Sequence, residues 1–120
     1  MKLEKSFIID VINLMPEESI AFIQAPSLEV ASIVERMGKT EFEYYNSLSL
    51  SKENKELLIQ EIINNDIQDY IHSIEIRNNG QLLFEGFDCV EFGTISKHIN
   101  LPVDFSKYIT EEICTISNDW

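Results

Sequence analysis

The chain has 120 residues, 44% of them hydrophobic, which is enough to fold as one globular domain over residues 1–120 without metal or disulfide support. Its formal net charge is −12, from 21 acidic and 9 basic side chains. So acidic a surface offers no basic face for a phosphate backbone, and anionic lipid repels it. We therefore expect a partner that is neither a nucleic acid nor a membrane.

The sequence predicts a cytoplasmic protein. No apolar run reaches the roughly 18 residues that a membrane-spanning helix needs. The short apolar run near the N-terminus is interrupted by Asp10, which is unlike a secretory signal. The two cysteines, Cys89 and Cys114, are too few for a disulfide framework, so we expect buried thiols in a reducing compartment.

The first half of the chain predicts two helices and two strands. Apolar residues recur at helical spacing over 3–15, and Pro16 ends that segment. Residues 19–24 read as a short strand. A second helix is expected to begin after Ser27 and to close at a left-handed Gly38. Residues 41–50 alternate between apolar and polar side chains, which predicts a strand.

A long helix and a β-hairpin follow. Ser51 is expected to cap a helix from Lys52 to about residue 70. Two alternating segments, 73–77 and 81–85, then flank a turn at 78–80. A three-residue loop would pair Ile76 with Leu82 and Ile74 with Phe84, keeping charged and apolar side chains on separate faces. The helix is expected to pack on the sheet through an isoleucine face: Ile59, Ile62, Ile63 and Ile67.

The C-terminal third fits two secondary structures in its first part. Asp88 and Glu91 have the spacing of a helix-capping box, which favours a helix or helical turn over 88–99, although alternation of Val90 and Phe92 also fits a strand. Pro102 is expected to start a final helix. The predicted fold is therefore α+β, with a mostly antiparallel sheet of about four strands, a central β-hairpin (73–85) and helices packed on at least one face.

Residues that could support catalysis do not form a recognisable site. His72, Cys89, His98 and Cys114 could in principle bind zinc, but no two of them have the close spacing of zinc ligands. A nucleophilic Cys89 with His98 as base would need an electropositive pocket, which so acidic a chain does not favour. We expect no metal, no cofactor and no enzymatic activity; the alternative is a small hydrolase or metal-dependent enzyme.

A binding surface is the stronger prediction. Four carboxylates occupy outward positions of the predicted strands, and an aromatic and an apolar side chain lie among them. If no helix covers this face, such a mixture suits a protein partner that is basic. The expected partner-binding residues are Glu41, Glu43, Tyr45, Glu75, Leu83 and Glu85.

In its size, its strong negative charge, its few cysteines and its lack of catalytic signatures, the whole chain resembles the small immunity and antitoxin proteins of bacterial toxin systems. The resemblance implies a non-catalytic inhibitor that neutralises a basic toxin by charge complementarity. The alternative is a structural or regulatory domain that self-associates, burying Tyr45 and Leu83 in a homodimer.

Overall fold

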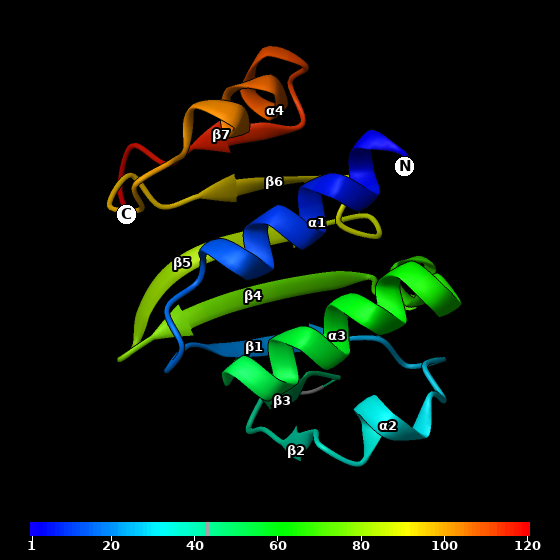
Figure 1. Cartoon of the computed structure of the whole chain (residues 1–120). Coiled ribbons are helices and arrows are strands. Elements are labelled where there is room, and N and C mark those ends of the chain that lie inside the picture. The colour runs from blue at the N-terminus through cyan, green and yellow to red at the C-terminus, as the bar shows by residue number, and fades with distance from the viewer. Residues whose placement is uncertain (43) are drawn as a thin grey trace.

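The computed structural model describes residues 1–42 and 44–120. Within them the chain forms four α-helices, two short 3-10 helices and a seven-stranded sheet (Figure 1). The helices are α1 (Leu3–Leu14), α2 (Ala31–Val34), α3 (Lys52–Asn65) and α4 (Ser106–Thr110), with η1 (Ile67–Tyr70) and η2 (Val103–Phe105) as the 3-10 helices. The strands are β1 (Ile20–Gln24), β2 (Gly38–Lys39), β3 (Asn46–Ser49), β4 (Ser73–Asn78), β5 (Gln81–Phe87), β6 (Phe92–Ile95) and β7 (Cys114–Ile116).

The strand order is β2-β3-β1-β4-β5-β6-β7, and every neighbouring pair is antiparallel except β6 and β7. The expected sheet of about four antiparallel strands is therefore wrong: the sheet has seven described strands and is mixed. The α+β class and the central hairpin are as expected. The additional strands are short, with two residues in β2 and three in β7, too few to show an alternating pattern.

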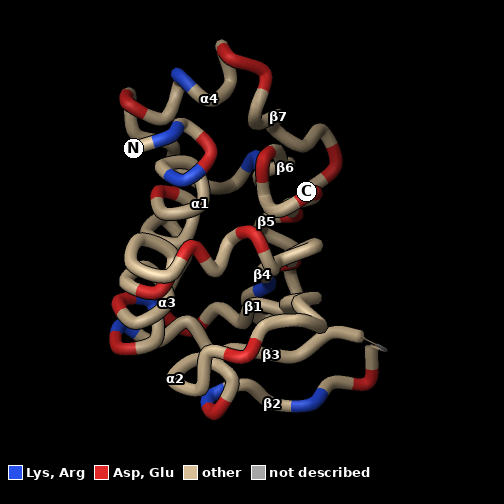
Figure 2. The backbone as a smooth tube through the Cα atoms, turned by 90° about the vertical axis from the view of Figure 1, so that its right-hand side faces the viewer, with Lys and Arg blue, Asp and Glu red and all other residues tan. Residues whose placement is uncertain are grey.

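Both long helices lie on the same side of the sheet (Figures 1 and 2). The core forms between them: the Phe7 ring of α1 meets the Phe84 ring of β5 edge to face, with centroids 5.8 Å apart. Ile62 of α3 is fully buried in the same cluster. As a result one sheet face is buried under α1 and α3, and none of the described helices lies on the opposite face (Figure 2).

The segment after the hairpin forms a turn and then strand β6. Asp88, Cys89 and Val90 all have positive φ, at 50°, 62° and 56°, so the chain reverses in left-handed backbone. This conformation is rare for residues other than glycine, and a sequence pattern gives no sign of it. The helix expected over 88–99 is wrong, and the strand alternative is correct for Phe92–Ile95. The turn places Val90 fully inside the core.

Two glycines allow β5 and β6 to pack under a buried aromatic ring. Gly86 and Gly93 are directly opposite each other in the ladder. A Cβ on Gly93 would lie 2.5 Å from the Glu85 carbonyl oxygen and 2.6 Å from Cζ of Phe84. The Phe84 ring therefore occupies the space that side chains at these two positions would fill.

The hairpin register differs from the expected one. Asn79 and Gly80 both have positive φ and form a two-residue turn, with Asn78 paired to Gln81. A bulge at Leu83 then restores apolar pairing, so that Ile76 lies opposite Phe84. A three-residue loop would separate charged from apolar side chains without an irregularity, and the bulge achieves the same separation one residue further from the turn.

Several helix and strand limits also need correction. Helix α3 ends at Asn65, because Asp66 takes a left-handed conformation and a 3-10 turn follows. Ile63 is 44% exposed, so it does not belong to the buried face of that helix. Gly38 lies in β2 rather than closing a helix. The final helix expected to start at Pro102 is the short α4, and the chain then forms β7. The first helix, residues 3–14, is confirmed.

Among the described helices, none combines the length and the apolar composition that crossing a membrane requires.

Candidate functional site

The helix-free face is defined here as the sheet face opposite α1 and α3. Cross-strand pairing places its residues in rows, because alternate residues of each strand point to the same side. One row runs through Ser47, Phe22, Glu75, Glu85, Thr94 and Thr115. Two residues further along the strands, a second row runs through Gln24, Ser73, Phe87 and Phe92.

A chain of hydroxyl hydrogen bonds crosses this face at the second row. Ser73 Oγ donates to Gln24 Oε1 at 3.0 Å and lies 2.7 Å from the Tyr45 hydroxyl. A serine hydroxyl has a single proton, so the Tyr45 hydroxyl is the donor to Ser73. These hydrogen bonds hold the half-buried Tyr45 ring against the sheet.

Two carboxylates lie side by side in the middle of the face. Glu75 and Glu85 are directly opposite each other on β4 and β5. Arg77, two residues from Glu75 on the same strand, forms an ion pair with it. Among the described residues Glu85 has no such partner, so the face carries an excess negative charge at its centre.

Aromatic rings surround the carboxylates. Phe87 and Phe92 are a cross-strand pair, and each is 45% exposed. On the other side of Glu75, the Phe22 ring packs edge to face with Phe42, with centroids 5.8 Å apart. Phe42 is itself 52% exposed.

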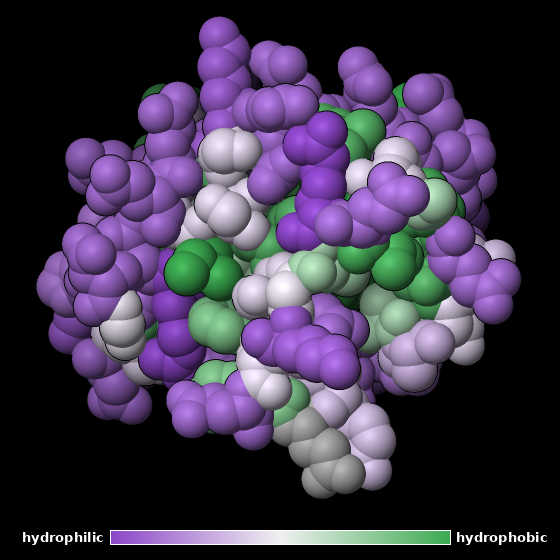
Figure 3. Space-filling model, turned by 90° about the horizontal axis from the view of Figure 1, so that it is seen from below, coloured by the Kyte–Doolittle hydropathy of each residue, from purple (hydrophilic) through white to green (hydrophobic). Residues whose placement is uncertain are grey.

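The underside of the molecule, around α2 and β2, also shows apolar groups that are surrounded by hydrophilic residues (Figure 3).

The six residues expected to bind a partner are only partly brought together. Glu75, Glu85 and Tyr45 lie on the helix-free face. Glu41 is exposed in the connection between β2 and β3, outside any strand, and Glu43 lies outside the described residues. Leu83 is 5% exposed and belongs to the hydrophobic core, because the bulge turns it away from solvent.

The aromatic pair Phe87 and Phe92 was missed. Phe87 lies just beyond the predicted end of the hairpin, and Phe92 was assigned to a helix. The alternation of Val90, Phe92 and Thr94, which fits a strand, is the signal in the sequence that indicates this pair. A strand there places Phe92 on the same face as Glu85.

The two cysteines lie away from the helix-free face, and the pKa of each thiol is raised above its ordinary value. Burial raises the pKa of the Cys89 thiol, and the nearby carboxylates of Asp69, Glu91 and Asp88 raise it further. Burial raises the pKa of Cys114 to about 11, although a hydrogen bond with the Ile95 backbone acts in the opposite direction. No group of three or more His, Cys, Asp or Glu side chains among the described residues is placed to hold a metal ion.

Comparison with known proteins found no relative: no family model, no curated protein and no solved structure matches this chain.

Proposed function

We propose that this chain is a non-catalytic protein-binding module that captures a basic protein, and that it acts as an immunity-type inhibitor of a basic bacterial toxin in the cytoplasm. The observation that supports the proposal is the helix-free face, where the Glu75–Glu85 pair lies beside the exposed Phe87–Phe92 pair. Carboxylates attract a cationic partner and speed its arrival, while partly exposed aromatic rings supply contact area once it has docked.

The position of Glu85 supports the same conclusion. Like charges directly opposite each other in a sheet destabilise it by about 0.2–1 kcal/mol. Arg77 pairs with Glu75 and leaves Glu85 with uncompensated charge. A cation supplied by a partner would relieve that repulsion, so the arrangement suits the bound state better than the free one.

The enzymatic alternative finds less support. A nucleophilic cysteine needs a depressed pKa, whereas burial and three carboxylates raise the pKa of Cys89. The thiol therefore stays protonated at neutral pH and is a poor nucleophile.

Self-association remains the competing function, and the exposed Phe87–Phe92 pair is the observation that favours it. A homodimer through this face would bring Glu75 and Glu85 of one copy toward those of the other. The two functions therefore respond in opposite ways to charge removal, since neutralising Glu85 would help a dimer and weaken capture of a basic partner.

A capture experiment with two variants tests the proposal. Immobilised wild-type protein, Glu85→Gln and the control Val103→Gln, which changes an exposed residue of η2, are exposed to lysate of the native host. We expect wild type and the control to retain the same basic protein and Glu85→Gln to retain several-fold less, while its stability equals or exceeds that of wild type. Recovery of the chain alone, or of a partner indifferent to Glu85→Gln, contradicts the proposal.

A further inference from the structure

The tip of the β4–β5 hairpin carries the only asparagine of the chain that a glycine follows, Asn79 before Gly80. Both residues are exposed, and both lie beyond the ladder, whose last pair is Asn78 with Gln81. The tip lies at the left margin of the molecule in Figure 1, where β4 runs into β5. Solvent therefore has access to the Asn79 carboxamide and to the Gly80 nitrogen.

The fold does not hold the Asn79 side chain in place. Its carboxamide forms no hydrogen bond with any of the described residues. The preceding asparagine differs, because Asn78 Nδ2 donates to Ser19 Oγ at 3.3 Å. Two consecutive asparagines therefore stand in unlike surroundings, and only the second is free to react.

The backbone nitrogen of Gly80 is equally free. Its N–H forms no hydrogen bond with the described part of the chain. A Cβ at Gly80 would meet no atom within 4 Å, so the space around this residue is open. Glycine leaves its own backbone torsions free, and the end of a hairpin opens at little cost in free energy. The Gly80 nitrogen can therefore approach the Asn79 side chain without unfolding of the domain.

We propose that Asn79 is a site of spontaneous deamidation in the folded protein, and that the products alter the hairpin. The Gly80 nitrogen gives its proton to hydroxide and attacks Cγ of Asn79, which closes a five-membered succinimide. The Cγ–Nδ2 bond breaks, and the leaving nitrogen takes up a proton and departs as ammonia. Water then opens one of the two ring carbonyls and leaves either aspartate or isoaspartate. The inference is independent of the proposed function.

The two products affect the hairpin differently. Aspartate keeps the length of the backbone, and Asp-Gly suits a two-residue turn as Asn-Gly does. Isoaspartate routes the backbone through Cγ and adds one carbon atom to the turn. Because turn length fixes the register, the longer turn disturbs the pairing that buries Leu83 and Phe84. We therefore expect isoaspartate, but not aspartate, to destabilise the protein.

Either product also adds a carboxylate beside Arg77. The Arg77 guanidinium forms an ion pair with Glu75, and its Nη1 donates to the Gly80 carbonyl oxygen at 3.3 Å, so it lies against the turn. The chain becomes one unit more negative than its original charge of −12. The new carboxylate competes with Glu75 for the same cation.

The test incubates folded wild-type protein at about pH 7 and about pH 9 and locates the reaction by mass spectrometry of its peptides. We expect Asn79 to exchange its NH₂ group for OH about tenfold faster than Asn78, because no Cβ hinders the glycine nitrogen. The rate should rise about tenfold per pH unit, since the attacking nitrogen must first lose a proton. Asp-N endoproteinase distinguishes the products, because it cleaves before aspartate and not before isoaspartate.

Two variants are the matched controls. Asn79→Gln lengthens the side chain by one methylene, so a five-membered ring cannot form and the site should stay intact. Freshly prepared Asn79→Asp carries the new charge without the longer backbone. It should melt with unreacted wild type, whereas the purified isoaspartate fraction should melt several degrees lower.

The chain unfolded in guanidinium chloride gives the reference rate. A folded-state rate within about a hundredfold of that reference supports the inference, and stronger protection overturns it. Reaction at Asn78 as fast as at Asn79 overturns it as well. An isoaspartate fraction as stable as Asn79→Asp would contradict the effect on the hairpin.

Discussion

Replacing Gly93 with alanine should destabilise the protein strongly, although the change adds only one methyl group. The added Cβ would lie 2.5 Å from the backbone oxygen of Glu85 and 2.6 Å from the Phe84 ring. An ordinary carbon–oxygen contact is about 3.3 Å, so β5 and β6 must separate by about 0.8 Å. Neither neighbour can move freely, since one is backbone and Phe84 is fully buried.

The expected loss is about 3 kcal/mol in the free energy of unfolding, at the upper end of the range for overpacked cores. Because a domain of this size has about 5–15 kcal/mol in total, the melting temperature should fall by about 10 °C. Gly93 does not have a positive φ, so backbone strain adds nothing to this cost.

Urea and thermal melts of the variant measure the effect, and Gly38→Ala is the matched control. The Cβ at Gly38 would meet only the flexible hydroxyl of Ser47, at 3.0 Å, so that variant should lose less than about 1 kcal/mol. A Gly93→Ala variant as stable as wild type would refute the close packing of β6 under Phe84. If Gly93→Ala is destabilising as expected, a double-mutant cycle with Phe84→Leu should show a coupling energy of about 0.5–3 kcal/mol between the two positions. The smaller leucine side chain relieves part of the clash with the added methyl group.

Three further predictions test the remaining structure. Ile62→Ala should cost about 2–5 kcal/mol in urea melts, whereas Ile63→Ala, one residue on, should cost less than about 1 kcal/mol; equal costs would contradict the orientation of α3. Ser51→Ala should cost about 1 kcal/mol, because the Ser51 hydroxyl accepts the Asn54 amide at the start of that helix; Ser51→Asn should keep most of the stability. Burial raises the pKa of Cys114 from 9.0 to about 11, so the thiol ionises in the unfolded chain first. The contribution of Cys114 to the unfolding free energy should therefore be constant below pH 9 and fall by up to about 2 kcal/mol between pH 9 and pH 11, and Cys114→Ala should remove that part of the decline.

The sequence predicted the elements whose signals are local. The apolar spacing of residues 3–14, the cap at Ser51 and the position of the hairpin turn near Gly80 each depend on a few neighbouring residues, and each is found in the structure, although the turn has two residues instead of three. The class of fold follows from these elements alone. Their exact lengths do not, because helix α3 ends where Asp66 adopts a left-handed conformation that its neighbours in sequence do not require.

The sheet count was wrong because two of the missed strands depend on distant partners. Strand β7 has three residues and pairs in parallel with β6, so only the completed sheet stabilises it. Strand β6 was hidden by Asp88 and Glu91, whose spacing is that of a helix cap. In the structure the same residues bound a left-handed turn, which holds Val90 in the core.

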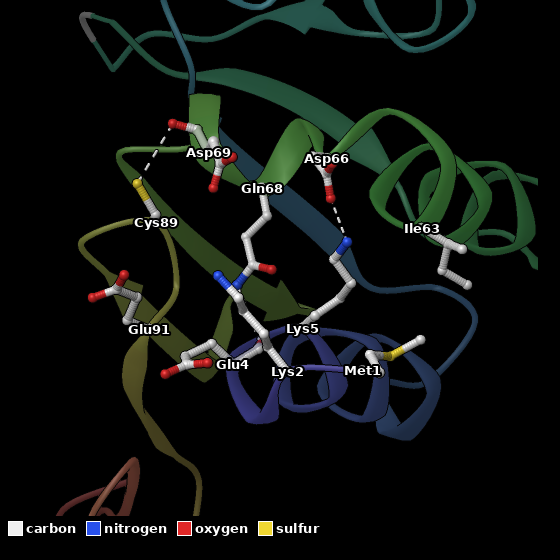
Figure 4. Close-up of a pocket in the computed structure, with 10 residues that line it drawn as sticks. All are labelled: Met1, Lys2, Glu4, Lys5, Ile63, Asp66, Gln68, Asp69, Cys89 and Glu91. Atoms are coloured by element: carbon white, nitrogen blue, oxygen red, sulfur yellow. Dashed lines mark hydrogen bonds and ion pairs between the residues drawn. The ribbon is translucent and has the colours of Figure 1, made fainter.

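The sequence predicted the charged residues of the helix-free face better than its apolar and aromatic residues. Glu75 and Glu85 lie on one face as expected, although in a different register: the two-residue turn followed by the bulge brings them opposite each other. Leu83 was misplaced by a bulge that no pattern announces, and Phe87 and Phe92 were missed with β6. The cavity lined by Lys5, Gln68 and Glu91 joins residues from three distant segments, so only the folded chain brings them together (Figure 4).

The central claim is that the helix-free face captures a basic protein, and the association rate measured against salt tests it most directly. With the captured partner in hand, stopped-flow mixing at about 50 mM and about 500 mM NaCl compares wild type with Glu85→Gln. We expect the wild-type rate to fall tenfold or more as salt rises, and the variant to start slower and fall less steeply. A rate indifferent to salt, or one that rises with it as for two acidic subunits of a homodimer, would contradict the claim.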